Sequence, residues 1–353
     1  SSGLYSYRAP LYPFFLSSVL AAGIKITVIN IYLIQSVVLF LSYVVVLFIL
    51  LRKKVELSGL VFLLLCISPF DAVYNGRLLA ENLLSPIVLL SVVLLFYHGN
   101  SKILGCVVPG FLLGLLTLTK DVFILLPLLI SVFIWFRGDN YKRIVIFLLV
   151  YIFTISPWII RNSTLESGNF VGVSKGILWS NLWVGSWMRS DTALSSAVKS
   201  GFVKEKDVFI FQEKIQKKEH EQDFFRNEFV NNISNDPLNV LYNWMYRIPK
   251  MWIGTRTDLF TMQYETKSIS WYVAKSVYFG FNAIVVGLFL VLSFRGIIQG
   301  DFLSYLVAAF VFYLAFVYMP FYNIETRYSQ PVLSVMLLYI GIRFSYYRKE
   351  KKC

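Results

Sequence analysis

The chain has 353 residues, of which 57% are hydrophobic and 15% charged, and this composition excludes an ordinary soluble globular protein. It predicts an all-α polytopic membrane protein. The formal net charge of +13 is then loop charge that orients the spans, so nucleic acid is not expected as a partner. Three cysteines, at Cys66, Cys106 and Cys353, have neither the spacing of a metal site nor that of a disulfide framework.

The first apolar segment covers residues 10–23 and is too short to cross a bilayer comfortably. Counting it as a crossing would invert the charge bias of every later loop. We therefore predict an interfacial helix that lies along the outer leaflet. The chain begins at Ser1 in a polar and aromatic stretch, so we also expect an upstream part with at least one transmembrane helix.

About nine apolar runs follow as predicted transmembrane helices, and basic residues at alternate ends mark the cytoplasmic side. The predicted spans are residues 26–51, 57–69, 78–97, 103–119, 122–136, 144–160, 270–294, 302–320 and 331–342. Several are shorter than the ~20 residues that a crossing usually needs, which suggests a thinned or water-filled outer cavity. The resulting division is an N-terminal transmembrane region, 1–161, and a C-terminal one, 268–353, with a basic cytoplasmic tail.

Residues 162–267 form the sizeable aqueous part, which is predicted to be a small extracytoplasmic cap with outer juxtamembrane helices. The mixture of Gly, Val, Trp and Asn over 168–187 is typical of a strand or loop. Apolar residues within 205–233 recur at helical spacing, and Asn235-Asp236-Pro237 ends that helix. A second amphipathic helix over 238–253 carries the side chains of a helix at the lipid interface, Trp244, Tyr246, Arg247, Lys250 and Trp252.

Charged side chains at the outer ends of the spans are the candidate site, because a charge in or near lipid needs a partner, a ligand or water. The residues predicted to gather there are Arg8, Glu81, Lys120, Asp121, Arg161, Glu325 and Arg327. Arg161 is the most informative of them. It follows an apolar run on the side where basic residues are not expected, and its planar guanidinium matches the oxygens of a lipid phosphate.

Structural alternatives stay open for these residues. Glu81 could pair with Arg77 one turn away, and Lys120 could mark a solvated turn. Arg161 could extend to lipid headgroups as a topology anchor. For the outer loop before the last span the alternative is a mutual salt bridge between Glu325 and Arg327. Three tryptophans of the cap are interpreted as packing or interface anchors rather than a sugar platform, namely Trp179, Trp183 and Trp187.

An ordered series of motifs carries a family resemblance. Tyr7-Arg8-Ala9-Pro10-Leu11-Tyr12-Pro13 precedes the first apolar run. The later motifs, in chain order, are Ser68-Pro69 with Glu81, Gly114–Lys120, Pro157–Asn162, Asn181–Gly185, Asn235-Asp236-Pro237 and Arg327–Pro331. The set resembles the polytopic glycosyltransferases of the C-type (GT-C) fold, which include the protein O-mannosyltransferases of glycosyltransferase family 39 and the aminoarabinose transferase of lipid A. The chain departs from that pattern at Ala9, where a proline is usual, and at Lys120, where arginine is common.

The resemblance implies transfer of a sugar from a polyprenyl-phosphate donor to a lipid, glycan or protein acceptor, with inversion, at the extracytoplasmic face of the plasma (inner) membrane. It implies that Glu81 is an acidic helper and that Arg8 and Tyr12 shape the donor entrance, while the main catalytic aspartate lies upstream of Ser1. The substrate-binding candidates are completed by Lys120, Arg161, Glu325 and Arg327. No metal ligands and no certain cofactor are predicted, although a divalent metal stays open.

Other classes of membrane protein remain alternatives. An O-antigen ligase or polymerase also combines many spans with a large outer loop and outer arginines, but would not carry this ordered motif series. A lipid-linked sugar flippase or other transporter predicts polar residues through the depth of several spans, whereas residues 36–50 and 144–154 are almost purely apolar. A purely structural membrane protein would leave the outer charges unexplained.

Overall fold

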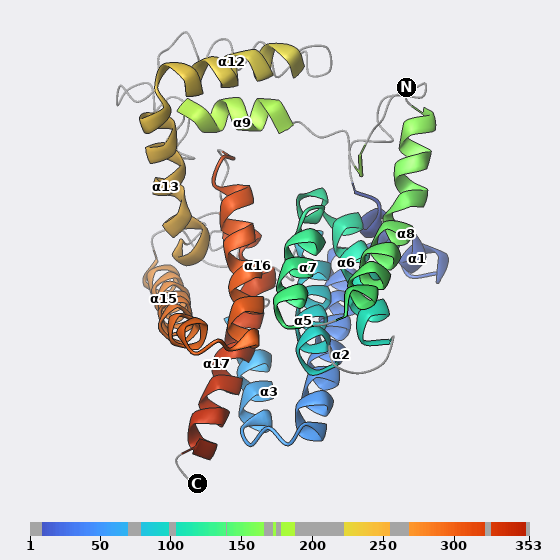
Figure 1. The fold of residues 1–353 in the computed structure, drawn as a ribbon, viewed down its shortest axis with the longest axis vertical. Coiled ribbons are helices and arrows are strands. Elements are labelled where there is room, and N and C mark those ends of the chain that lie inside the picture. Colours follow the sequence, from blue (N-terminus) through green and yellow to red (C-terminus); the bar gives the residue numbers. More distant parts are fainter. Residues whose placement is uncertain are drawn as a thin grey trace. The chain divides into compact units, whose positions relative to one another are not determined.

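The computed structural model describes residues 9–69, 79–98, 104–138, 140–165, 172–173, 178–187, 222–254, 268–321 and 326–350. Every regular element within these ranges is a helix (Figure 1), so the all-α prediction is confirmed. The chain divides into two compact units. Unit 1 comprises 1–175, 257–312 and 329–353, and unit 2 comprises 176–256 and 313–328.

Unit 1 holds most of the apolar helices. They are α1 (Leu11–Ala21), α2 (Val28–Arg52), α3 (Ser58–Ile67), α5 (Glu81–His98), α6 (Leu104–Thr119), η2 (Asp121–Phe123), α7 (Leu126–Phe136), α8 (Tyr141–Leu165), α15 (Ile269–Ile298), α17 (Gln330–Glu350) and the first part of α16 (Phe302–Tyr318). Helix α5 packs against α2, α6 and α17, and α6 packs in turn on α8. Helix α5 therefore has neighbours from both the N-terminal and C-terminal parts of the chain.

Local capping explains where the long helices begin and end. Helix α2 starts where the Thr27 hydroxyl accepts a hydrogen bond from the Asn30 backbone N–H at 3.2 Å. The Ser268 hydroxyl does the same for the N–H of Trp271, also at 3.2 Å, at the start of α15. Gly300 follows α15 with a φ of 74°, a conformation that favours glycine and turns the chain into α16.

Three helices of the described residues are long and apolar enough to cross a membrane, namely α2, α8 and α15, with 25, 25 and 30 residues. Large apolar side chains on them face outward, as Phe153 does at 78% exposure. Each of the other six predicted spans coincides with a helix, but those helices are shorter or more polar. The structure thus has the character of a helical membrane protein, while helix length alone does not support nine crossings.

Unit 2 contains α9 (Leu178–Trp187), α12 (Gln222–Asn235), α13 (Pro237–Ile253), η3 (Thr326–Tyr328) and the end of α16. Helix α12 lies along α9, and α13 also packs on α9 (Figure 1). The core of the unit is aromatic. Trp183, Val184 and Phe225 are buried, and a shell of partly buried rings surrounds them, Trp179, Trp187, Phe224 and Phe229. Trp183 is therefore a packing residue, as interpreted from the sequence.

One prediction for the cap is wrong and two are confirmed. Residues 178–187, expected as strand or loop, form the helix α9, whose tryptophans recur every fourth residue and so share one face. The break at Asn235-Asp236-Pro237 is confirmed, since α12 ends at Asn235 and α13 begins at Pro237, with Asp236 capping the N–H of Asn239 at 3.2 Å. The predicted helix at 238–253 is also confirmed as α13. Residues 205–221 lie outside the described residues.

Candidate functional site

A buried polar network joins α1, α2 and α5 in unit 1. Nε2 of Gln35 donates a hydrogen bond to the Tyr12 hydroxyl at 2.9 Å, and Oε1 of Gln35 accepts one from Nδ2 of Asn82 at 3.0 Å. Gln35 and Asn82 are each only 1% exposed. A buried polar group without a partner costs about 1–3 kcal/mol, so these two bonds fix the orientation of the Gln35 amide and fasten α1 to the helices behind it.

Directly before Asn82, Glu81 forms an ion pair with Lys120. The Lys120 ammonium donates to Oε1 of Glu81 at 2.7 Å, and the two side chains are 20% and 8% exposed, respectively. Lys120 stands between α6 and η2, so the pair connects the start of α5 with the turn after α6. Among apolar helices an unpaired charge of either sign would be costly. Each charge therefore stabilises the other.

In detail, these residues lie differently from the sequence prediction. Glu81 is the first residue of α5 and does not lie one turn inside it. The expected alternative partner, Arg77, lies outside the described residues. Lys120 does mark a turn, because η2 begins at the next residue, but its side chain is paired rather than simply solvated.

Burial raises the pKa of the Tyr12 phenol above its ordinary value, even though the hydrogen bond from Gln35 lowers it.

A second cluster surrounds Arg161 on α8. The Arg161 guanidinium carbon lies 4.3 Å from the centre of the Trp158 ring, and Nη1 donates to Oδ1 of Asn162 at 3.0 Å. Asn162 is 0% exposed, and its Nδ2 donates to the backbone carbonyls of Gly172 and Val173, both at 3.1 Å. Those two bonds leave the oxygen of the amide to face Arg161. The guanidinium is thus held on the indole face in one orientation.

Arg161 lies inside helix α8, whereas the sequence predicted it at the end of a span. Helix α8 continues to Leu165, and the Thr164 hydroxyl bonds back to the carbonyl of Ile160 at 2.8 Å. The ring of Trp158 also contacts Phe14 of α1 edge-on, with 5.7 Å between ring centres. Helix α1 therefore contacts both clusters. Tyr12, its second residue, belongs to the buried polar network, and Phe14 contacts Trp158, on whose ring the Arg161 guanidinium lies.

The remaining predicted residues are not brought into this site by the described contacts. Arg327 belongs to unit 2, where its Nη2 donates to the Tyr328 hydroxyl at 2.9 Å. The Tyr328 ring stacks on Tyr318 with 4.5 Å between centres. Arg8 and Glu325 lie outside the described residues, and so does the predicted bridge from Glu325. Among the described residues, the structure thus brings together Tyr12, Glu81 and Lys120, and it connects Arg161 to them through α1 and through the packing of α6 on α8.

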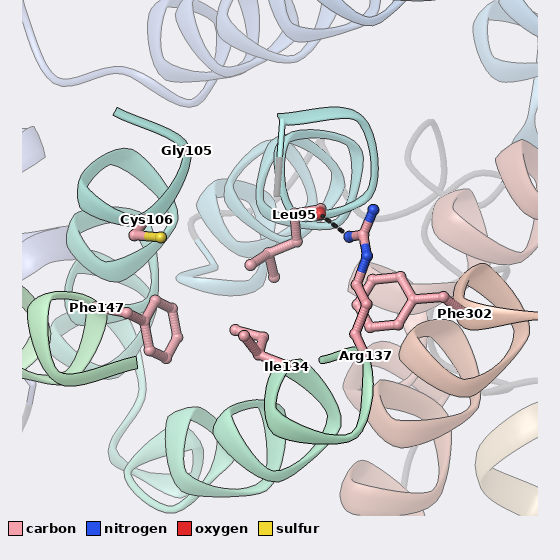
Figure 2. Close-up of a pocket in the computed structure, with 7 residues that line it drawn as sticks. All are labelled: Leu95, Gly105, Cys106, Ile134, Arg137, Phe147 and Phe302. Atoms are coloured by element: carbon pink, nitrogen blue, oxygen red, sulfur yellow. Dashed lines mark hydrogen bonds between the residues drawn. The ribbon is translucent and has the colours of Figure 1, made fainter. Parts of the chain in front are cut away.

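Unit 1 also contains a small cavity (Figure 2). Its volume is ≈ 10 Å³, and it is lined by Leu95, Gly105, Cys106, Ile134, Arg137, Phe147 and Phe302. Arg137 closes one side, donating to the Leu95 carbonyl at 3.3 Å and lying over the Phe302 ring at 4.3 Å. That volume holds about one water. Leu95 follows Glu81 on α5 at a distance of about 21 Å along the helix axis, so this cavity is not a substrate site for the charged pair.

Sequence reasoning missed Gln35 and Asn82, although a signal was present. Each is a primary amide in a mainly apolar segment, where a polar side chain needs a partner. Within the described part of the chain, no group of three or more His, Cys, Asp or Glu side chains is placed to hold a metal ion.

Comparison of the chain with protein-family models, curated proteins and solved structures finds no match. Function is therefore inferred from the residues themselves.

Proposed function

We propose that this protein is a membrane glycosyltransferase, which moves a sugar from a polyprenyl-phosphate donor to an acceptor at the extracytoplasmic face with inversion at the anomeric carbon. The observation that carries the proposal is the pair of Glu81 and Lys120, 2.7 Å apart where apolar helices end. Opposite charges kept in such a place favour a functional role. The proposed reaction needs both a carboxylate and a cation.

In the proposed reaction the acceptor hydroxyl gives its proton to a carboxylate while its oxygen attacks the anomeric carbon. The bond from that carbon to the phosphate oxygen breaks, and its electron pair leaves with the phosphate. Cations stabilise the charge that develops there. Lys120 supplies one cation and Arg161 a second, whose planar fork suits two phosphate oxygens. Glu81 orients the Lys120 ammonium and acts as the acidic helper beside the main base that the resemblance implies.

The topology is part of the same proposal. Nine helices cross the membrane, with the short α3 and α7 beside a thinned outer region, and the basic ends face the cytoplasm. The Glu81 and Lys120 ends of α5 and α6 then face outward, together with Arg161, Arg327, Arg8 and Glu325. The mostly apolar α2 and α8 support a one-sided site rather than a transport path through the bilayer.

The test measures donor binding and transfer by the full-length protein reconstituted in liposomes. The binding probe is polyprenyl phosphate, and the transfer assay follows release of polyprenyl phosphate from a panel of its sugar derivatives. Arg161→Ala is expected to weaken binding about tenfold or more, because a charge-assisted contact contributes about 1.5–3 kcal/mol. Lys120→Met is expected to lower the transfer rate as well as binding.

Arg226→Ala is the matched control, because Arg226 also lies over a tryptophan, Trp179, at 5.6 Å, but in unit 2. It is expected to bind and transfer like the unaltered protein. Wild-type binding by both Arg161→Ala and Lys120→Met would refute the phosphate role. Movement of the intact donor across the bilayer without sugar release would instead identify a flippase.

A further inference from the structure

One face of α13 is apolar and exposed to the surroundings. Its side chains recur at the three- and four-residue spacing of a helix stripe. The exposed fractions are 78% for Leu238, 47% for Leu241, 54% for Tyr242, 54% for Met245 and 49% for Tyr246. The opposite face is buried against the rest of unit 2 through Val240, Asn243, Arg247 and Met251. The exposed stripe is therefore separate from the packing of the unit.

This stripe differs from the one that the sequence indicated. Arg247 and Trp252 were expected at a lipid interface, but Arg247 is only 1% exposed and its Nη1 donates to the Met319 carbonyl at 3.4 Å. Trp252 is 6% exposed. Both residues belong to the interior of unit 2, and neither can contact lipid from there.

A row of amphipathic side chains runs along one edge of the stripe. The rings of Tyr242 and Tyr246 stack with 6.4 Å between centres, and the Lys250 ammonium lies 5.7 Å from the Tyr246 ring. Tyrosine and lysine have apolar bodies and polar tips, so they suit the boundary between lipid tails and headgroups. A cation in this row also suits anionic headgroups.

We infer that α13 lies on the surface of a lipid bilayer through the stripe formed by Leu238, Leu241, Tyr242, Met245 and Tyr246. The inference does not depend on the proposed transferase activity. We assign a lipid bilayer to the stripe because the row of Tyr242, Tyr246 and Lys250 suits the headgroup boundary. In addition, α15, a helix of bilayer length, begins fifteen residues after the end of α13. The first turns of α15 already carry exposed apolar side chains, such as Ile269 at 84%. A helix of this kind sinks about 5–10 Å into the interface.

The test places a fluorophore on a single cysteine of the full chain, after replacement of Cys66, Cys106 and Cys353. Met245→Cys reports on the stripe. Asn227→Cys on α12 is the matched control, because Asn227 is an exposed polar residue of the same unit. The labelled proteins are reconstituted at high lipid-to-protein ratio in vesicles of neutral and anionic phospholipid that contain nitroxide-labelled lipids of known depth.

The Met245 label is expected to be quenched most strongly by nitroxides near the headgroups and first chain carbons, and to be shielded from iodide in the water. The Asn227 label is expected to show the reverse. Equal access of iodide to both labels would overturn the inference. The inference would also be overturned if the Met245 label were shielded from both quenchers and this shielding disappeared on further dilution with lipid. That result would mean that a second copy of the chain covers the stripe. As a second variant, Leu241→Asp with Met245→Cys is expected to lose the lipid quenching while the helix content stays unchanged.

Discussion

The ion pair between Glu81 and Lys120 gives a quantitative prediction for stability. Removal of one partner of a buried ion pair lowers the stability of the folded protein by about 3–5 kcal/mol. An exposed pair contributes only about 0–1 kcal/mol to that stability. With side-chain exposures of 8% and 20%, this pair stands closer to the buried class. Glu81 is also the first residue of α5, where a negative charge gains about 0.3–1 kcal/mol from the helix dipole. Glu81→Gln is therefore expected to lower the free energy of unfolding by about 2–4 kcal/mol.

The assay is a double-mutant cycle on the full chain in mixed micelles, with unfolding by increasing SDS. Lys120→Met alone should destabilise by leaving the carboxylate unpaired. The double variant, Glu81→Gln with Lys120→Met, should recover part of the loss, because no unpaired charge remains. Additivity of the two single changes within about 0.5 kcal/mol would mean that the side chains do not interact, and the argument for a coupled site would then fail.

Three further predictions concern positions outside the pair. Gln35→Leu removes both bonds of the amide that links α1, α2 and α5, and should cost about 1–3 kcal/mol in the same unfolding assay. Gly185→Ala should strongly lower the thermal midpoint, because the alanine methyl group would overlap a backbone carbonyl of unit 2. Gly287→Ala on α15 is the control, since its methyl group would meet no atom within 4 Å, and the change should be neutral or stabilise by about 0.5–1 kcal/mol. Asp301→Ala removes the carboxylate that caps the first turn of α16 and pairs with the Arg343 guanidinium at 3.4 Å. It should lower stability by about 2–5 kcal/mol, which the shift in the SDS midpoint measures.

The helices were predictable because apolar runs and breaks are local signals. Helix α13 begins where Asp236 caps it and Pro237 fits its first turn, and both features are visible in the sequence. The error at α9 came from composition, since valine is common in strands and glycine and asparagine are common in turns and loops. The spacing of its tryptophans was the better signal, because side chains four residues apart share a helical face. Helix α8 continues past Asn162 to Leu165, and the Asn162 amide donates to the carbonyls of Gly172 and Val173, ten and eleven residues further along the chain.

The partners within the candidate site depend on tertiary packing and could not be found in the same way. Glu81 and Lys120 are 39 residues apart in sequence, and they meet only because α5 packs against α6. The local alternative, Arg77, is equally reasonable from sequence alone. The same holds for Gln35, which reaches Tyr12 over 23 residues and Asn82 over 47. Sequence identified which side chains are too polar for their surroundings, and the packing of α1, α2, α5 and α6 decided which of them satisfy one another. A residue that is both out of place in its segment and paired across helices is thus a stronger candidate for function than either feature alone would make it.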